Sequence, residues 1–183
     1  MSYEAAVNKA WDELLAFNPP KNFSVKFLAD EYSFDVSERK AISASCNVPA
    51  KDYAAILMLH YQLARLKSLP VMQNEWLDFK ELSGVEGYEP VFRKRVIEPI
   101  IRKYGKVPEG LIKAGAKFKA KKSDKGDIGI IIEVFEGVPA LVLFWKADDE
   151  FGAEANVLFD KSIGKIFCIE DIIVMAEMIA RQL

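Results

Sequence analysis

The sequence predicts a single α+β domain over residues 1–183, with a mostly antiparallel sheet packed by helices. The chain has 183 residues and 51% of them are hydrophobic, which is enough for one buried core. Short apolar runs separated by polar linkers, typical of antiparallel strands, occur in two stretches, 23–45 and 127–159. Longer segments with apolar residues at helical spacing precede, separate and follow these two stretches.

The N-terminal half begins with a predicted helix over residues 3–16, which Ser2 can cap and Asn18-Pro19-Pro20 ends. Three predicted strands follow it: 23–28, 31–36 and 40–45. In the second strand Tyr32 and Phe34 alternate with polar residues, the period of a half-buried antiparallel strand. These runs predict a small meander or pair of hairpins.

The middle of the chain contains the clearest helix, over residues 50–67, where no breaker interrupts a broad apolar face. Residues 75–82 fit a strand or a helix equally well. The next helix, over residues 88–104, contains Pro99, which predicts a kink or a split because proline removes a backbone hydrogen bond and crowds the preceding turn.

The C-terminal half changes from helix to sheet. Residues 108–118 predict a short helix, and the lysine-rich segment 119–127 predicts an exposed loop. The apolar runs after it predict a hairpin, a third strand and a last helix: 127–135 with 139–145, then 155–159, then 168–183. Glycine in the short turn between the first two runs supports the hairpin.

The two cysteines, Cys46 and Cys168, each lie in a largely apolar setting, so we expect buried, reduced thiols, with a disulfide as the alternative. Two cysteines do not complete a four-ligand zinc or iron–sulfur site. No early stretch resembles a signal peptide, and no uncharged apolar run reaches the length of a membrane span. The sequence therefore predicts a cytoplasmic protein that does not associate with membranes.

Charge is segregated along the chain although the net charge is only −2. Residues 1–92 carry −4, residues 93–125 carry +9 and residues 126–183 carry −7. This pattern predicts a protein partner or a homo-oligomer joined through complementary charged faces. Nucleic acid is not expected as a partner, because the lysine cluster between Lys113 and Lys125 contains one aromatic residue, Phe118, and the isoelectric point is about 5.6. A solvated lysine loop is the simpler interpretation.

An acidic stretch, Asp148-Asp149-Glu150, follows the apolar run that ends at Trp145, and Asp160 closes the next run. If the two strand ends meet, these carboxylates can offer oxygen ligands to a divalent cation such as Mg²⁺ or Ca²⁺. The spacing does not match an EF-hand loop. The alternative is a solvated turn, with Asp160 as a helix cap or a turn former.

His60 is the only histidine, which excludes metal sites that need two imidazoles from one chain. The sequence has no GxSxG motif to present a serine to it. We expect a core or interface histidine with a satisfied hydrogen bond, and a general base is the alternative. As a polar group in an apolar helix, His60 is also a candidate ligand-binding residue.

Two arginines and a tryptophan are further candidates for ligand binding. On a regular helix Arg93 falls on the apolar side with Val96 and Ile97, where a guanidinium needs a carboxylate partner or an anionic ligand. The sequence therefore predicts either an ion pair with a C-terminal acid or a bound anion. Arg95 is a candidate anion clamp, and Trp145 stands where the apolar run meets the acidic stretch.

Together these segments resemble the prokaryotic domain family DUF3786 over nearly the whole chain. The similar elements are Leu59-His60-Tyr61, Trp76, Phe79, Tyr88, Phe92, Arg95, Pro99, Trp145, Asp149-Glu150-Phe151, Leu158-Phe159-Asp160 and Glu170-Asp171. The resemblance implies a cytosolic protein of anaerobic prokaryotes and makes the acidic stretch a family feature. Some members carry an added cysteine-rich iron–sulfur module, but this chain lacks those cysteines, so no cluster is expected. The resemblance implies no particular reaction.

Two functions from different classes stay open on the sequence alone. The first is an accessory protein of anaerobic metabolism that binds a ligand or partner in a cleft between the acidic stretch and the helix of Arg93 and Arg95. The second is a divalent-metal-dependent enzyme in which the acidic stretch and Asp160 hold the metal and Arg95 binds an anion. Because no catalytic motif is recognisable, the sequence does not decide between enzyme and binding protein.

Overall fold

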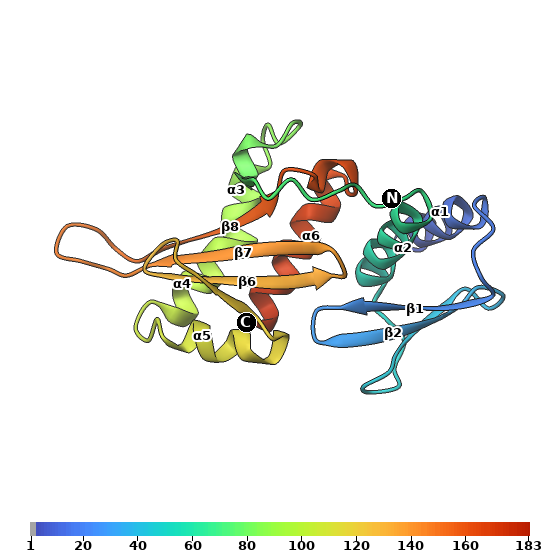
Figure 1. Cartoon of the computed structure of the whole chain (residues 1–183), viewed down its shortest axis with the longest axis horizontal. Helices are drawn as coiled ribbons and strands as arrows, with labels where there is room; N and C mark the ends of the chain where they lie inside the picture. Colours follow the sequence, from blue (N-terminus) through green and yellow to red (C-terminus); the bar gives the residue numbers. More distant parts are fainter. Residues whose placement is uncertain (1–2) are drawn as a thin grey trace.

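Two antiparallel sheets, each packed by helices, form the fold in a computed structural model that describes residues 3–183 (Figure 1). The predicted class, α+β with antiparallel strands packed by helices in a single domain, is confirmed. Ser2, the predicted helix cap, lies outside the described residues. Within residues 3–183, none of the helices is long and apolar enough to cross a membrane.

The N-terminal half combines a three-stranded sheet with two helices. Its elements are α1 (Tyr3–Leu15), β1 (Asn22–Phe27), β2 (Asp30–Asp35), β3 (Lys40–Ser43) and α2 (Asp52–Leu66). The strand order is β1-β2-β3, and α1 packs against α2. Trp11 of α1 lies against Phe34 of β2 with 5.9 Å between ring centroids, which fixes the helix on the sheet. The helix and the three strands thus form where the sequence predicts them.

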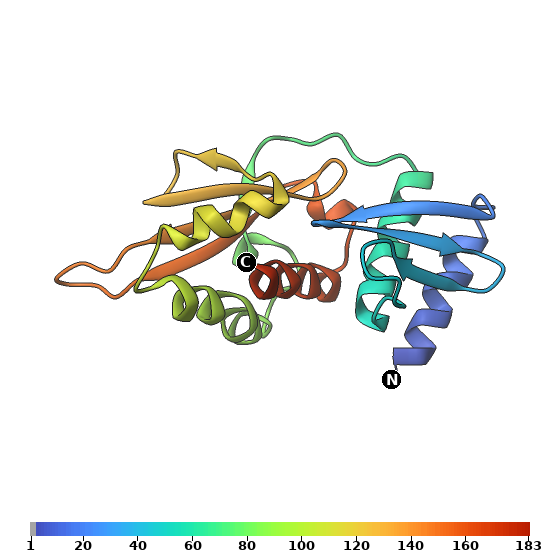
Figure 2. The same ribbon diagram turned by 90° about the horizontal axis from the view of Figure 1, so that it is seen from below.

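The C-terminal half is built on a five-stranded sheet of order β4-β8-β7-β6-β5. Its strands are β4 (Trp76–Asp78), β5 (Lys121–Ser123), β6 (Ile128–Phe135), β7 (Val138–Trp145) and β8 (Glu154–Asp160). Its helices are α3 (Glu89–Phe92), α4 (Glu98–Tyr104), α5 (Gly110–Gly115) and α6 (Ile169–Gln182). Helices α4 and α6 lie on the same side of this sheet (Figure 2).

The helix-covered face of the large sheet is the main apolar surface of the molecule. Alternate residues of the three central strands are buried on it: Ile130, Ile132, Val134, Ala140, Val142, Phe144, Ala155, Val157 and Phe159. The turn of the central hairpin is at Glu136-Gly137, where Gly137 has a φ of 75° that other residues rarely adopt. The predicted hairpin and the third strand are therefore correct.

The predicted loop 119–127 is partly wrong, because it contains the short edge strand β5, which pairs with β6. Its residues are lysines and a serine, which carry no apolar signal, so main-chain pairing alone makes this strand. Exposed lysines on an edge strand also discourage pairing with another molecule. At the pairing position of Ser123, a Cβ on Gly129 would lie 2.6 Å from the carbonyl oxygen of Lys125, so only glycine fits there.

Two segments with conflicting signals are resolved by the structure. The ambiguous stretch 75–82 is both a strand and a helix: β4 ends at Asp78, which caps a 3₁₀ turn over Phe79–Glu81. The helix predicted over residues 88–104 is split, as Pro99 indicates, into α3, a π-helical segment over Arg93–Ile97, and α4.

Aromatic side chains join the two halves into one core. Phe135, at the end of β6, stacks on Phe27 of β1 at 4.8 Å and on Tyr61 of α2 at 4.4 Å between ring centroids. The hydroxyl of Tyr61 donates to the carbonyl of Glu136 at 2.8 Å, and the amide of Leu28 donates to the carbonyl of Val134 at 2.8 Å. These contacts fix how the small sheet and α2 sit against the large sheet.

Replacing Phe135 by alanine is expected to lower the free energy of unfolding by about 3–5 kcal/mol, because it removes a fully buried ring that contacts both halves. The matched control is Phe151→Ala, since Phe151 is 69% exposed and its loss should change the free energy by no more than about 0.5 kcal/mol. Urea unfolding of both variants makes the comparison. Equal effects would show that Phe135 does not join the halves.

Candidate functional site

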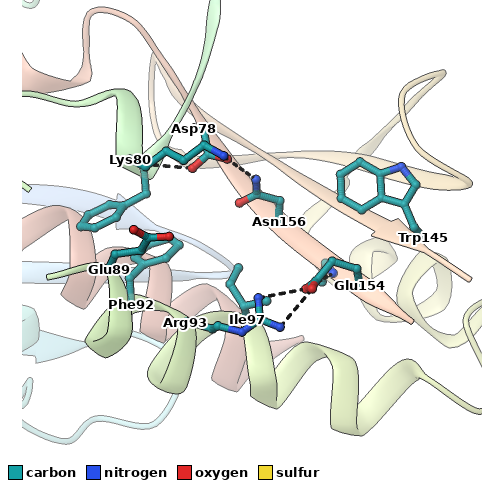
Figure 3. Close-up of a pocket in the computed structure, with 11 residues that line it drawn as sticks. Asp78, Lys80, Glu89, Phe92, Arg93, Ile97, Trp145, Glu154 and Asn156 are labelled. Carbon is teal, nitrogen blue, oxygen red and sulfur yellow. Dashed lines mark hydrogen bonds and ion pairs between the residues drawn. The ribbon is translucent and has the colours of Figure 1, made fainter. Parts of the chain in front are cut away.

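A cleft of about 440 Å³ lies at one edge of the large sheet (Figure 3). Strand β4 pairs with only Leu158, Phe159 and Asp160 of β8, so Glu154–Val157 have β7 on one side and, among the described strands, none on the other. Helix α3 and the π-helical segment lie along this open edge. Incomplete strand pairing therefore creates the cleft.

The floor of the cleft is aromatic. Phe79 and Phe92 are stacked almost parallel, with 4.1 Å between ring centroids and an angle of 5° between ring planes. Both are buried, and the edge of Phe92 also meets Phe159 of β8. At the opposite rim lies the indole of Trp145, which is 38% exposed.

One wall of the cleft is an ion pair between Arg93 and Glu154. The distance from Arg93 Nη2 to Glu154 Oε2 is 3.0 Å, and a longer contact of 3.4 Å joins Nη1 to Oε1. The hydrogen bond and the charge of Glu154 raise the pKa of Arg93, which stays fully protonated. About half of each side chain is exposed, so water competes for the pair and its net contribution to stability is small.

The other wall is a hydrogen-bonded set around Asp78. Asn156 Nδ2 donates to Asp78 Oδ2 at 2.6 Å, and the amide of Lys80 donates to Asp78 Oδ1 at 3.1 Å. The side-chain oxygen of Asn156 accepts from the amide of Val157 at 2.8 Å. Both ends of the Asn156 amide are thus held, which fixes its orientation in the cleft.

Side chains satisfy the backbone where β4 stops. The amide of Ala155 donates to Glu154 Oε1 at 3.0 Å, in the same way that the amide of Val157 donates to Asn156. Without these bonds, two amides of the strand would face the cleft with no partner from a neighbouring strand. Glu154 and Asn156 therefore have two roles, since they complete the strand and line the cleft.

The cleft carries an excess of negative charge. Its ionisable side chains are Asp78, Lys80, Glu89, Arg93 and Glu154, which sum to −1. Arg93 pairs with Glu154, and Lys80 lies 3.8 Å from Asp78. Within residues 3–183 no cationic nitrogen lies within 4.0 Å of the Glu89 carboxylate. The charge of Glu89 acts on Arg93 without a close contact, so Glu89 is the acid of the cleft that has no ion-pair partner among the described residues.

The sequence-predicted ligand-binding residues are divided among different places. Arg93 and Trp145 both line the cleft, whereas His60 lines another cavity and Arg95 lines two more. The prediction that Arg93 faces the apolar side is wrong, because 53% of its side chain is exposed. A π turn holds more residues than an α turn, so the side chains around it project in directions that a regular helix does not predict. The ion pair of Arg93 with a C-terminal acid, one of the two predicted alternatives, is present.

The four candidate metal ligands do not come together. Asp148, Asp149 and Glu150 lie in the loop between β7 and β8, whereas Asp160 is at the opposite end of β8. Seven residues of extended strand separate the two ends by about 20 Å. In the part of the chain that the structure describes, no group of three or more His, Cys, Asp or Glu residues is placed to hold a metal ion.

Asp148 and Asp160 instead organise the chain near them. Asp148 Oδ1 accepts from the amides of Glu150 and Phe151 at 2.9 and 2.7 Å, which closes a turn at the surface. Asp160 is 3% exposed and its carboxylate accepts from the amides of Gln73, Asn74 and Ser162 and from the Ser162 hydroxyl. Burial acts to raise the pKa of Asp160, but these hydrogen bonds outweigh it and hold the pKa below its usual range.

His60 makes a hydrogen bond across the two halves. Its Nδ1 lies 2.7 Å from Asp171 Oδ2 at the start of α6, in the manner predicted for an interface histidine. Burial acts to lower the pKa of His60, but the hydrogen bond and charge of Asp171 outweigh burial and raise it. Cys168 lines the same cavity as His60 and is exposed as a residue. Partial burial of its thiol nevertheless raises the pKa of Cys168 to about 11. The thiol is therefore protonated at neutral pH and is a weak nucleophile.

The expected burial of the cysteines is wrong, since Cys46 and Cys168 are both exposed and are not bonded to each other. Cys46 lies in the turn after β3 and Cys168 precedes the first turn of α6, so both lie at ends of elements where the backbone meets solvent. Apolar neighbours in the sequence do not bury a residue at such a position.

Sequence reasoning missed most of the cleft, including Asp78, Glu89 and Asn156. One signal was available: Asp78 precedes Glu81 by three residues, the spacing of a capping box, which predicts a fixed position for Asp78. No sequence signal marks Glu89 or Asn156 as a site residue; their position in the cleft follows from the open strand edge and the split helix.

Comparison with known proteins identifies one family. The family described as "Domain of unknown function (DUF3786)" matches residues 11–182. No curated protein and no solved structure matches the chain.

Asp160→Asn is expected to lower the free energy of unfolding by about 1–3 kcal/mol, because the new amide would point a donor at an amide that the carboxylate now accepts from. The matched control is Asp149→Asn, which removes the same charge from an exposed position and should change the free energy by no more than about 0.5 kcal/mol. Since the pKa of Asp160 is lowered by folding, its contribution is present above the pKa of an unfolded aspartate and is lost as pH falls through the folded value. Urea unfolding between pH 2 and pH 7 measures both effects.

The pKa of His60 is expected to lie above the ordinary histidine value of about 6.5 in the folded chain, and to fall in Asp171→Asn, where the charge of Glu13 is left to oppose burial. NMR can follow this without assignment, because the chain has one histidine. Folding favours protonated His60, so the stability it contributes is complete below the unfolded pKa and is lost as pH rises through the folded pKa. An unchanged pKa in the variant would show that Asp171 does not control His60.

Proposed function

The chain belongs to the DUF3786 family, and from the geometry of its cleft we propose that it is a ligand-binding protein that holds a small organic cation at the open edge of β8. The observation that carries the proposal is the unbalanced carboxylate of Glu89 in a cleft with an aromatic floor and an exposed indole at its rim. We place this activity in an accessory role in prokaryotic metabolism.

The charge of the cleft favours a cation over an anion. An anionic ligand would have to displace Glu154 from Arg93 and would also meet Asp78 and Glu89. A ligand with one ammonium group would neutralise the cleft and leave both existing ion pairs in place. Charge complementarity of this kind contributes mainly to specificity.

The aromatic groups suit the apolar part of such a ligand. An ammonium over the face of Trp145 would gain about 0.5–1 kcal/mol at an exposed position, and about 2 kcal/mol if water is excluded. Phe79 and Phe92 are buried and stack on each other, so they form a rigid apolar support beneath the cleft, and little side-chain entropy would be lost there on binding. Asn156, held at both ends, would give a directional contact to a polar group of the ligand.

The π-helical segment supports a binding role for this edge. Such segments are rare and often occur at functional sites, where they give side chains a direction that an α-helix does not allow. Here the segment brings Arg93 against Glu154 and exposes both groups to the cleft. A metal-dependent enzyme built on the acidic stretch receives no comparable support, because Asp160 is far from Asp148, Asp149 and Glu150.

The test is isothermal titration calorimetry of the full chain with choline and with putrescine, and with glutarate as an anion of similar size. We expect the cations to bind and glutarate not to bind. Glu89→Gln and Trp145→Ala should each weaken binding by about tenfold, which corresponds to about 1.4 kcal/mol. Both residues are exposed, so neither change should affect the fold.

Glu86→Gln is the matched control, because it removes the same charge from an exposed residue near α3 that does not line the cleft. It should bind as the unmodified chain does. If Glu86→Gln and Glu89→Gln weaken binding equally, the loss of affinity comes from the overall charge of the protein and not from the cleft. Absence of binding to both cations, or equal binding of glutarate, would contradict the proposal.

A further inference from the structure

A second cavity, a groove of about 830 Å³, runs between α6 and the helical segment that contains Arg93–Ile97 and α4. Six of its lining residues are ionisable: Lys94, Arg95, Arg102, Lys103, Glu177 and Arg181. Five are cationic and one is anionic, so the groove carries a charge of +4 in a chain whose net charge is −2. We call these six residues and the space between them the basic groove.

Two guanidinium groups of the basic groove are held by one carboxylate. Glu177 Oε2 lies 3.8 Å from Arg95 Nη1, and Glu177 Oε1 accepts a short hydrogen bond from Arg181 one turn further along α6. Glu177 is itself mostly buried, with 18% of its side chain exposed. It therefore positions Arg95 and Arg181 beside each other at one end of the groove.

The other three cations have no such partner. Within residues 3–183, no carboxylate oxygen lies within 4.0 Å of the side-chain nitrogens of Lys94, Arg102 or Lys103. Lys94 and Arg102 are eight residues apart, with Pro99 between them on the same side of the helical segment. Eight residues of helix span about 12 Å, so an anion would need more than one charged group to contact both Lys94 and Arg102.

A smaller cavity of about 440 Å³ adjoins the basic groove, because Arg95, Glu177 and Arg181 line both. This cavity adds Tyr3 of α1 and Tyr53 of α2, which come from the N-terminal half. Aromatic side chains beside a cluster of cations suit a ligand that joins a planar ring to a group with several negative charges.

We propose that the basic groove binds a small molecule that carries clustered phosphate groups, with a planar ring of that molecule against Tyr53. Arginine forks and lysines are the side chains that proteins use for phosphate, and a charge of +4 matches two or three linked phosphates better than one carboxylate. The ligand would touch both halves of the molecule. This site is separate from the cleft at the edge of β8, and it is basic where the cleft is acidic.

The test is isothermal titration calorimetry of the full chain with inorganic tripolyphosphate, adenosine triphosphate and orthophosphate, in metal-free buffer of low ionic strength. We expect tripolyphosphate and adenosine triphosphate to bind more tightly than orthophosphate, and the affinity to fall as salt is added. The double variant Arg102→Glu with Lys103→Glu should raise the Kd for tripolyphosphate by about tenfold or more. Absence of binding to all three probes overturns the proposal.

The matched control is Lys122→Glu with Lys125→Glu, which makes the same charge change at exposed lysines in and beside β5 that do not line the groove. It should change the Kd by less than about twofold. If the two double variants weaken tripolyphosphate binding equally, the probe is attracted by the overall charge of the protein, and the proposed site is overturned.

Tyr53→Ala separates the ring from the phosphates. If the ring lies against Tyr53, adenosine triphosphate should bind more tightly than tripolyphosphate, and Tyr53→Ala should remove this advantage and leave tripolyphosphate binding unchanged. If adenosine triphosphate keeps its full advantage in this variant, the placement of the ring against Tyr53 is wrong.

Discussion

The contact of Phe135 with Phe27 and Tyr61 is the interaction on which the rest of the structure depends. It lies where the tip of the central hairpin meets the first strand and the second helix, so it joins a small sheet and a large sheet that would otherwise bury separate cores. The hydrogen bond between His60 and Asp171 then holds α2 beside the start of α6. The cavity with Tyr3 and Tyr53 combines residues from both halves, so its shape depends on these contacts.

The π-helical segment decides how the basic residues of the middle of the chain are used. Arg93, Lys94 and Arg95 are consecutive, yet Arg93 lies in the acidic cleft at the edge of β8, whereas the next two line the basic groove against α6. The segment packs between β8 and α6, so residues on its opposite sides reach different cavities. Pro99, which lacks an amide hydrogen, makes the regular helix less favourable here and so allows the wider turn. One irregular turn thus separates two sites of opposite charge.

The segregation of charge along the sequence survives only in part in space. The basic residues of 93–125 are spread over the acidic cleft, the basic groove, α5 and the lysine-rich edge at β5, and one acid from α6, Glu177, lies in the basic groove. The acids of the C-terminal segment are also dispersed: Asp148 closes a turn, Glu154 completes a strand edge, and Asp160 anchors the chain that precedes β4. Carboxylates from one short segment of the sequence therefore have different structural roles, because strand β8 carries them to different ends of the sheet.

The sequence by itself determined the fold class, the order of the elements and most of their bounds, because hydrophobic periodicity and proline or glycine signals are local properties. It also indicated a carboxylate partner for Arg93, although the premise that Arg93 lies on the apolar side was wrong, and a hydrogen-bond partner for His60. It did not reveal strand β5, whose pairing is a main-chain contact with β6, or the exposure of Cys46 and Cys168. Only the tertiary structure decided that Glu89 and Asn156 share a cleft and that Asp160 stands apart from Asp148, Asp149 and Glu150. The physical reason is that a site is made of distances between segments that are remote in the sequence, and strand register and helix packing set those distances.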